Sequence, residues 1–568
     1  MSRRPLAHLL SASTTDLPGA SASGHRAATS TRTGIGSDQT GPQPRPSSAR
    51  TFYLALIVVA LAAAAISLLI PSTPSYDPWS WIIWGREIVH INLQTTGGPT
   101  WKPLPVIFTT LFALFGKAEP DLWLVVARAG AFAAVVMVFR LSVRLTRQIG
   151  SYFVSAPADS GRAGVVLAWL PALLGGTVAA IGLALSGGYI SSNALGYSEG
   201  LATAAILIAL ERHMDGKPRQ AFAVGFLGAL DRPEIWLFWG PYGLWLFWKD
   251  PAARKLVIGL FVLIPILWFG PEYWGSGHLL RGASRAQHVR SNSLALAKCP
   301  FCAELTKAAW PTVLLRIKAA AVVLVAVVGV LVLRSRRTPR TFFADTRTYA
   351  MAVAATVGAL GVAWFVVVAL MTQIGFSGNN RYLVIGSAMV EICGAVAWGW
   401  AARELGTLFV RGLRRSREAA AGAVVQFGEL AAVGIVGLAF LFAPNWIGHN
   451  LIDIPVTHRS IVYQASLRTG VSEIVARYGG APKLLRCGSV MTEGFQVPLV
   501  AWTLDVHTLR VQGPPAAGTQ PSTTAPNAIL QTRASRNLAL LPFLSQWPTV
   551  HYRYAGRSGP FRLYTHCA

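Results

Sequence analysis

Charged side chains are scarce in this chain, acidic ones above all. Only 13% of its 568 residues are charged whereas 53% are hydrophobic, and 24 acidic residues stand against 50 basic ones. The apolar residues gather in runs near the ~20 residues that cross a bilayer as a helix. This composition excludes a soluble core and indicates a polytopic membrane protein.

Nucleotide-binding signatures are missing as well. The sequence has no GxxxxGK[ST] loop and no dinucleotide fingerprint between a strand and a helix. The formal charge of +26 would suggest nucleic acid as the partner of a soluble protein. Here the cations concentrate in loops that the positive-inside rule assigns to the cytoplasm, so membrane topology explains the excess and no nucleic acid is expected.

A cleavable signal peptide is the third absence, because the first residues lack an apolar h-region. Residues 1–50 are rich in Ser, Thr, Gly, Pro and Arg, and too poor in apolar residues to order themselves. We expect a disordered, basic cytoplasmic tail. The first span, 52–70, then directs insertion into the cell membrane, with Pro71 facing outward.

Hydrophobic runs predict about eleven membrane helices within residues 51–445. They are expected near 52–70, 122–139, 164–185, 199–211, 220–238, 236–248, 255–270, 316–333, 347–372, 383–402 and 429–443, with an ill-defined boundary between the fifth and sixth. Two large outer loops are expected at 72–120 and 271–315. In the first, Trp79, Trp81, Trp84 and Trp101 suit a half-wet interface, and the apolar piece 104–115 is too short to span.

A cytoplasmic start and an odd number of spans place residues 446–568 on the outer side of the membrane. There 458–479 has the pattern of a helix, whereas 497–512 alternates like a strand and 513–527 looks like a flexible loop. The predicted fold is therefore an all-α membrane bundle with a small C-terminal α+β extracytoplasmic domain.

The five cysteines divide according to this topology. Cys487 and Cys567 both fall in the outer domain, where oxidising conditions permit a disulfide. Cys299 and Cys302 form a CPFC pair with no second CxxC or His pair nearby, which favours a local disulfide over a zinc site. Cys393 lies within a span as a small packed side chain.

Asp77 is the first candidate for chemistry, because a carboxylate close to the outer interface is costly there unless it has a role or a partner. An acceptor hydroxyl could give its proton to this group as a general base. The structural alternative is that Asp77 caps a helix whose first residue is Pro78. The two interpretations are compatible, since a cap can also face a site.

Other charged residues lie at the predicted outer ends of spans, where they are functional candidates by default. These are Glu199, Asp231, Arg232, Glu234, Glu272 and Arg381. Mutual ion pairing or snorkelling is the alternative for each. Their common level predicts one outward cavity, in which Lys102, Arg232 and Arg381 could bind a lipid-linked phosphate.

Several motifs resemble the GT-C superfamily of membrane glycosyltransferases, particularly its protein O-mannosyltransferase and lipid A aminoarabinose transferase type. The resemblance covers roughly 52–400, and the C-terminal domain resembles the accessory domains of many members. It is carried by Asp77 in the first outer loop, "WKPLPVIFTTLFALFG" followed by "ARAGA", "YSEGLATAAILIALERH", "GFLGALDRPE" and "FSGNNRYLVIGSA".

The resemblance implies transfer of mannose or another hexose or pentose from a polyprenyl-phosphate donor to an envelope glycan, lipid or protein, with inversion. Asp77 would be the catalytic base, and Lys102, Arg232 or Arg381 would stabilise the departing phosphate. Glu199, Glu234 and Glu272 would orient the sugar or the acceptor. Many members have two acidic residues in the first loop, whereas Asp77 has no acidic neighbour until Glu87, so no cofactor is assigned and a divalent metal remains open.

Two rival functions follow from the same charges. A flippase or transporter would bind the lipid phosphate without catalysis, but we find no inverted repeat or matched pair of broken helices. A noncatalytic envelope assembly protein would use its outer domain to bind a partner. Intact function after Asp77→Ala would favour this second rival.

Overall fold

The computed structural model describes residues 48–149, 167–289, 293–334, 345–416, 421–442, 454–514, 524–532 and 542–567. Nearly all of the tail predicted at 1–50 lies outside these ranges, as does most of the loop predicted at 513–527. The first helix begins at Ser48, four residues before the predicted span.

Each of the predicted spans overlaps a helix, although the fifth, 220–238, was drawn too long, because its helix ends at Asp231. The helices are α1 (Ser48–Ser67), α4 (Glu119–Ile149), α6 (Leu170–Leu185), α8 (Glu199–Met214), α9 (Pro218–Asp231), α10 (Trp236–Lys249), α11 (Arg254–Ser276), α15 (Leu315–Arg334), α17 (Thr346–Gln373), α18 (Val384–Ser416) and α19 (Ala421–Phe442). Within the described chain, 6 helical stretches are long and apolar enough to cross a membrane, and two more are apolar but shorter. The chain is a multi-pass membrane protein.

Glycines allow the central helices to approach closely. A Cβ on Gly130 of α4 would lie 2.5 Å from the Leu201 Cα of α8. A Cβ on Gly394 of α18 would lie 2.2 Å from the carbonyl oxygen of Ile317 on α15. Small residues at such crossings let dispersion forces act between helix backbones, which matters where lipid removes the hydrophobic drive for association.

The predicted outer loop at 72–120 is mostly helical. It forms α2 (Tyr76–Val89), α3 (Pro103–Phe112) and the 3₁₀ turn η1 (Ala113–Ala118), which ends the predicted short apolar piece. The four tryptophans were expected to be half wet, and that prediction is wrong, because each is 2% exposed or less. Their indole rings are covered by α3, by neighbouring tryptophans and by the C-terminal part of the chain.

The second predicted outer loop, 271–315, also contains short helices. Helix α11 continues to Ser276 and is followed by α12 (Arg281–Gln287), η4 (Leu294–Leu296), α13 (Pro300–Ala303), the π-helical turn η5 (Glu304–Ala309) and α14 (Trp310–Thr312). Cys299 and Cys302 are joined by a disulfide at the start of α13. The segment packs against α17 (Thr346–Gln373) through η4, α13 and η5.

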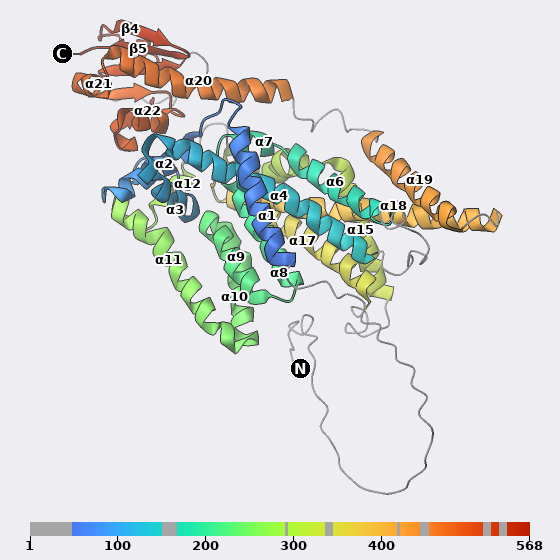
Figure 1. Ribbon diagram of the computed structural model, residues 1–568. Coiled ribbons are helices and arrows are strands. Elements are labelled where there is room, and N and C mark those ends of the chain that lie inside the picture. The colour runs from blue at the N-terminus through green and yellow to red at the C-terminus, as the bar shows by residue number, and fades with distance from the viewer. Residues whose placement is uncertain are drawn as a thin grey trace, which may run out of the picture.

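The C-terminal unit mixes helices with one sheet and lies at one end of the bundle (Figure 1). Its elements are α20 (Ile454–Tyr478), α21 (Ala481–Cys487), β1 (Val490–Thr492), α22 (Val497–Leu504), η7 (Thr508–Arg510), β2 (Val511–Gln512), β3 (Ala528–Thr532), η9 (Leu544–Gln546), β4 (Arg553–Ser558) and β5 (Phe561–Thr565). The sheet order is β2-β1-β3-β5-β4, with β1 parallel to β2 and β3, and β5 antiparallel to β3 and β4.

Two of the sequence predictions concern elements of this unit. The helix expected at 458–479 is confirmed by α20, whereas the strand expected at 497–512 is wrong over its first half, which forms α22. Alternation of Val497, Leu499 and Ala501 does not distinguish a strand from a short helix buried on most sides. Pro498, in the first turn of α22, is the signal for a helix start.

A disulfide between Cys487 and Cys567 closes the C-terminal unit across 80 residues of sequence. We expect the double variant Cys487→Ser/Cys567→Ser to lose roughly 4 kcal/mol of local stability, because the unfolded loop regains its conformational freedom. Hydrogen exchange of the β1, β3 and β5 amides in the full-length protein measures this loss.

The matched control for this prediction removes the other pair, Cys299→Ser/Cys302→Ser, which closes a separation of only 3 residues. It should leave exchange in the sheet unchanged. Equal protection in wild type and in the Cys487/Cys567 variant would contradict the prediction.

Candidate active site

The ends of several elements meet where the bundle joins the C-terminal unit. Asp77 is in the first turn of α2, Lys102 directly precedes α3, and Glu199 begins α8. Asp231 ends α9, Arg232 and Glu234 lie at the turn η2 (Pro233–Ile235), and Arg381 lies in the turn η6 (Asn380–Leu383) that leads into α18. Charges far apart in the sequence thus converge, as their predicted common level indicated.

Asp77 is not the cap of its helix. Helix α2 begins at Tyr76 with Ser75 at the cap position, so Asp77 is the second helical residue. Its Oδ2 accepts a hydrogen bond from Arg381 Nη2 at 2.7 Å, and both side chains are 15% exposed. A carboxylate in the first turn also lies favourably in the field of the helix dipole.

Arg381 links Asp77 to the interior of the site. Its Nε lies 3.6 Å from Glu199 Oε1, and its guanidinium carbon lies 4.0 Å from the centroid of the Tyr197 ring. Cations over the face of a tyrosine are attracted by the ring quadrupole. The side chain is therefore fixed on three sides, by two carboxylates and an aromatic face.

Glu199 is the centre of the ion-pair network. Its Oε1 lies 2.6 Å from Arg232 Nη2, 3.6 Å from Lys102 Nζ and 3.6 Å from Arg381 Nε. The side chain is 2% exposed. A carboxylate this deep in an apolar bundle needs compensating charge, and three cations converge on one of its oxygens.

Further pairs extend the network away from Asp77. Arg232 Nη1 donates to Glu234 Oε1 at 3.2 Å, and its guanidinium lies 4.1 Å from the Tyr382 ring. Lys102 Nζ donates to Ser198 Oγ at 3.1 Å and lies 3.8 Å from Asp231 Oδ1. Four carboxylates, of Asp77, Glu199, Asp231 and Glu234, thus face three cations, of Lys102, Arg232 and Arg381.

Glu272 belongs to a different network. Its carboxylate accepts from Thr95 Oγ1 and from the Trp101 backbone, and it lies 3.5 Å from Arg281 Nη1. Arg281 in turn donates to the carbonyls of Thr96, Gly98 and Pro99. Glu272 therefore holds the segment that leads to Lys102, and among the described residues it forms no hydrogen bond or ion pair with the Asp77 network.

Two tyrosines complete the site and were not singled out from the sequence. The Tyr197 hydroxyl lies 3.2 Å from Ser75 Oγ, and the Ser75 backbone donates to Leu195 at 2.9 Å, so the Tyr197 loop is tied to the start of α2. Tyr382 lies against both Arg232 and Arg381. Tyr197 stands two residues before Glu199 in "YSEG", and Tyr382 directly follows Arg381 in "NNRY". The available sequence signal was therefore an aromatic residue close to a charged candidate, where a cation–π contact can form.

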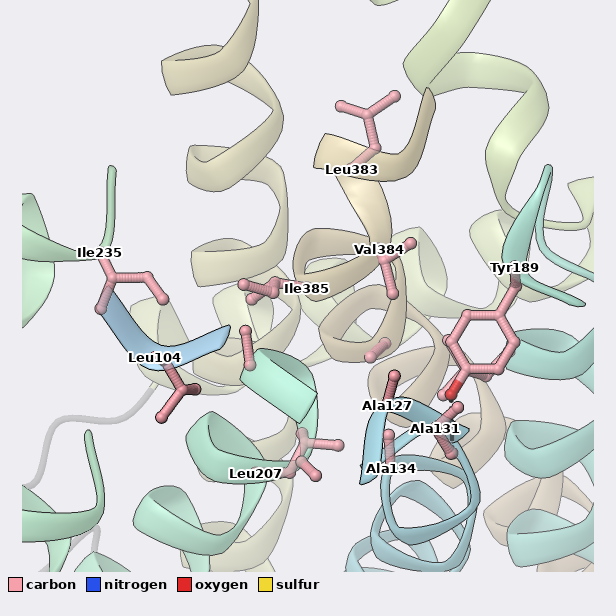
Figure 2. Close-up of a cluster of buried hydrophobic side chains, with 14 of the residues drawn as sticks. Leu104, Ala127, Ala131, Ala134, Tyr189, Leu207, Ile235, Leu383, Val384 and Ile385 are labelled. Atoms are coloured by element: carbon pink, nitrogen blue, oxygen red, sulfur yellow. Dashed lines mark hydrogen bonds between the residues drawn. The ribbon is translucent and has the colours of Figure 1, made fainter. Parts of the chain in front are cut away.

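A cluster of buried hydrophobic side chains lies within the bundle (Figure 2). It is drawn with Leu104, Ala127, Ala131, Ala134, Tyr189, Leu207, Ile235, Leu383, Val384 and Ile385, all buried. Several of them adjoin a site residue in the sequence, as Ile235 adjoins Glu234. Low polarity within the bundle strengthens each ion pair and raises the cost of leaving a charge without a partner.

No group of three or more His, Cys, Asp or Glu side chains within the described ranges is placed to hold a metal ion. The site carboxylates contact Lys and Arg side chains instead. As it stands, the arrangement offers cations for an anionic ligand and one rim carboxylate for a hydroxyl.

No protein-family model matches the chain, and no curated protein matches it either. Among solved structures, it is similar to ArnT from Cupriavidus metallidurans, in the apo state and bound to undecaprenyl phosphate. Each match has 12% sequence identity and a TM-score of 0.45, and covers 91% of this chain and 98% of the other. These values assign no role to any residue.

The position of Glu199 predicts a large stability effect. Glu199→Gln would remove the carboxylate that Lys102, Arg232 and Arg381 share, and would leave the buried Arg232 with Glu234 as its remaining ion-pair partner. We therefore expect a loss of about 3–5 kcal/mol and a clearly lower thermal midpoint of the purified protein. Asp77→Asn should cost much less, because Asp77 is more exposed and has one recorded cationic partner.

Asp505→Asn is the control, since Asp505 pairs with Arg86 while its side chain is 83% exposed. An exposed pair contributes about 0–1 kcal/mol, so the midpoint should hardly change. If Glu199→Gln unfolded at the same temperature as Asp505→Asn, Glu199 would not be the centre of the network.

Proposed function

We propose that the protein is a membrane glycosyltransferase that moves a sugar from a polyprenyl-phosphate donor to a hydroxyl of an envelope acceptor. The observation that carries this proposal is the Asp77–Arg381 pair at the rim of the buried network. It sets a carboxylate that can accept a proton beside a cation that can stabilise a phosphate, as glycosyl transfer from a lipid phosphate requires.

Asp77 suits the role of general base by its contacts. Arg381 holds Oδ2, whereas no hydrogen bond from any described residue reaches Oδ1. With its side chain 15% exposed, Asp77 can meet a substrate that the deeper carboxylates cannot. Its fixed position in the first turn of α2 orients this free oxygen.

The donor phosphate would bind the rim cations. Arg381 and Lys102 have side chains 15% and 12% exposed, whereas Arg232 is 4% exposed and held between Glu199 and Glu234. We therefore assign phosphate binding to Arg381 and Lys102. Arg232 would act by positioning Glu199, with Glu234 holding Arg232 in turn.

The proposed step is a single displacement. The acceptor oxygen attacks the anomeric carbon, its proton passes to Asp77, and the bond to phosphate breaks with both electrons going to the leaving polyprenyl phosphate. Attack opposite the leaving group inverts the anomeric carbon. Arg381 lies where it could offset the charge that develops on the phosphate.

The remaining assignments rest on sequence and topology. The sugar would be mannose or another hexose or pentose, and the acceptor an envelope glycan, lipid or protein. By the positive-inside rule, the basic loops and an odd number of spans would put the N-terminus in the cytoplasm, and the C-terminal unit with the Asp77 site on the outer side. Glu272 would act indirectly, by holding the segment before Lys102.

The proposal predicts that Asp77→Asn lowers sugar transfer by about 10²–10⁴-fold, the usual contribution of a general base. The assay follows radiolabelled sugar from polyprenyl-phosphate donors into envelope acceptors, in membranes with equal amounts of wild-type or variant protein. Asp250→Asn is the control.

Asp250 is also paired with an arginine, Arg219, at 2.5 and 2.8 Å, but in the connection between α10 and α11. In Figure 1 this connection lies at the end of the bundle away from α2. Its variant should transfer sugar like wild type. Equal transfer by Asp77→Asn would remove Asp77 from catalysis, and no transfer with any donor would favour a flippase or an assembly protein.

A further inference from the structure

Helix α2 has the site on one side and the C-terminal unit on another. Its Trp79 ring lies 5.9 Å from the Trp502 ring of α22, and Arg86 donates to Asp505 and to the carbonyl of Val506. Glu87 Oε1 lies 2.6 Å from His507 Nδ1. Residues 79, 86 and 87 share one face of a helix with 3.6 residues per turn, so the unit is fastened along the length of α2.

The contact continues to the first residue of the helix. The Tyr76 ring lies 6.4 Å from the Phe495 ring, edge to face. Tyr76 directly precedes Asp77, the proposed base. Phe495 therefore brings the C-terminal unit to the rim of the site itself.

Phe495 comes from the carboxyl edge of the parallel strands. Strand β1 is parallel to β2 and β3 and ends at Thr492, so the 493–496 loop leaves the sheet at the edge where all three strands end. Open sheets with parallel strands characteristically bind ligands outside this edge. Here that edge is directed at the start of α2.

The loop is firmly held although its aromatic ring is accessible. Thr532 Oγ1 donates to Glu493 Oε2 at 2.6 Å within the buried interior, and the Gln496 backbone donates to the Glu493 carbonyl at 2.8 Å. Phe495 nevertheless remains 40% exposed. A large apolar ring kept accessible on an anchored loop, next to a site, is suited to bind a ligand.

We propose that Phe495, together with Tyr76, forms a binding subsite for the sugar ring of a glycan acceptor. This inference rests on the proposed function and makes Phe495 a specificity-determining residue. The C–H face of a sugar pairs with an aromatic ring, while its hydroxyls remain free to approach Asp77. The donor instead requires cations, which lie on the bundle side at Lys102 and Arg381.

Binding is tested on the full-length protein in phosphatidylcholine nanodiscs. Saturation-transfer NMR with the methyl glycosides of mannose, glucose, galactose and arabinose should give ring-proton signals from at least one glycoside. Phe495→Ala should weaken that binding by roughly three- to tenfold, the size of one aromatic contact. Phe495→Trp should retain it.

Phe543→Ala is the matched control, because Phe543 is 37% exposed on the same unit. Within the described ranges its ring makes no contact with the rings of α2. It should bind like wild type. Binding that is equal in Phe495→Ala and wild type, or absent with all four glycosides, would overturn the proposal.

Transfer kinetics separate this inference from the proposed function. Phe495→Ala should raise the KM for the acceptor while the donor KM and kcat hold, which a general structural defect would not do. If sugar transfer requires Asp77 but is unchanged in Phe495→Ala, the acceptor subsite is contradicted and the proposed function stands. If glycoside binding depends on Phe495 but the wild-type protein transfers no sugar, the glycosyltransferase function is contradicted and the subsite stands.

Discussion

Burial of Glu199 among three cations is the interaction on which the arrangement of the site depends. Within an apolar bundle a lone carboxylate or guanidinium would be strongly disfavoured, so Lys102, Arg232 and Arg381 must each find a partner. They find the same oxygen, and this forces the starts of α3, α8 and α18 and the end of α9 to one place. The network therefore constrains how these helices pack, whatever part it has in catalysis. Asp77 joins it at the rim, through Arg381, which is why α2 has a fixed position relative to the bundle.

The same helix transmits that position to the C-terminal unit. Along α2 the docking contacts combine the tilted ring pair of Trp79 and Trp502 with polar pairs. Burial raises the pKa of Glu87, although this carboxylate accepts from the Gln94 backbone and faces His507. A buried polar contact between two units is demanding in geometry, because a small shift leaves a group without its partner. Placement of the unit and placement of Asp77 are thus coupled by one rigid element of 14 residues.

The spans and the convergence of charges could be predicted from the sequence, because both follow from the cost of polar groups in hydrocarbon. Long apolar runs located the helices, and the common level of Glu199, Arg232 and Arg381 brought them together correctly. The predictions that were wrong concern residues whose environment depends on tertiary packing. The tryptophans of α2 look interfacial until a second unit is known to bury them, and α22 alternates like a strand because nearly all its sides are apolar. Glu272 has the same predicted level as the site residues but forms its ion pair with Arg281, in another network. The sequence pattern does not indicate which acidic residue Arg281 pairs with.

The proposed choice of Asp77 as the base rests on burial rather than on charge. Four carboxylates face three cations, so one carboxylate is in excess whichever pairs are counted. Exposure decides where that excess can act: Asp231 is 0% exposed, Glu199 2% and Glu234 5%, whereas Asp77 reaches 15%. The interior carboxylates pair with the cations, and under the proposed function the outermost carboxylate is the one that a substrate hydroxyl would meet. An anionic donor that engages Arg381 would compete with Asp77 for the same guanidinium. In the proposed mechanism, donor binding and release of the Asp77 carboxylate toward the acceptor would then be two consequences of one ion pair.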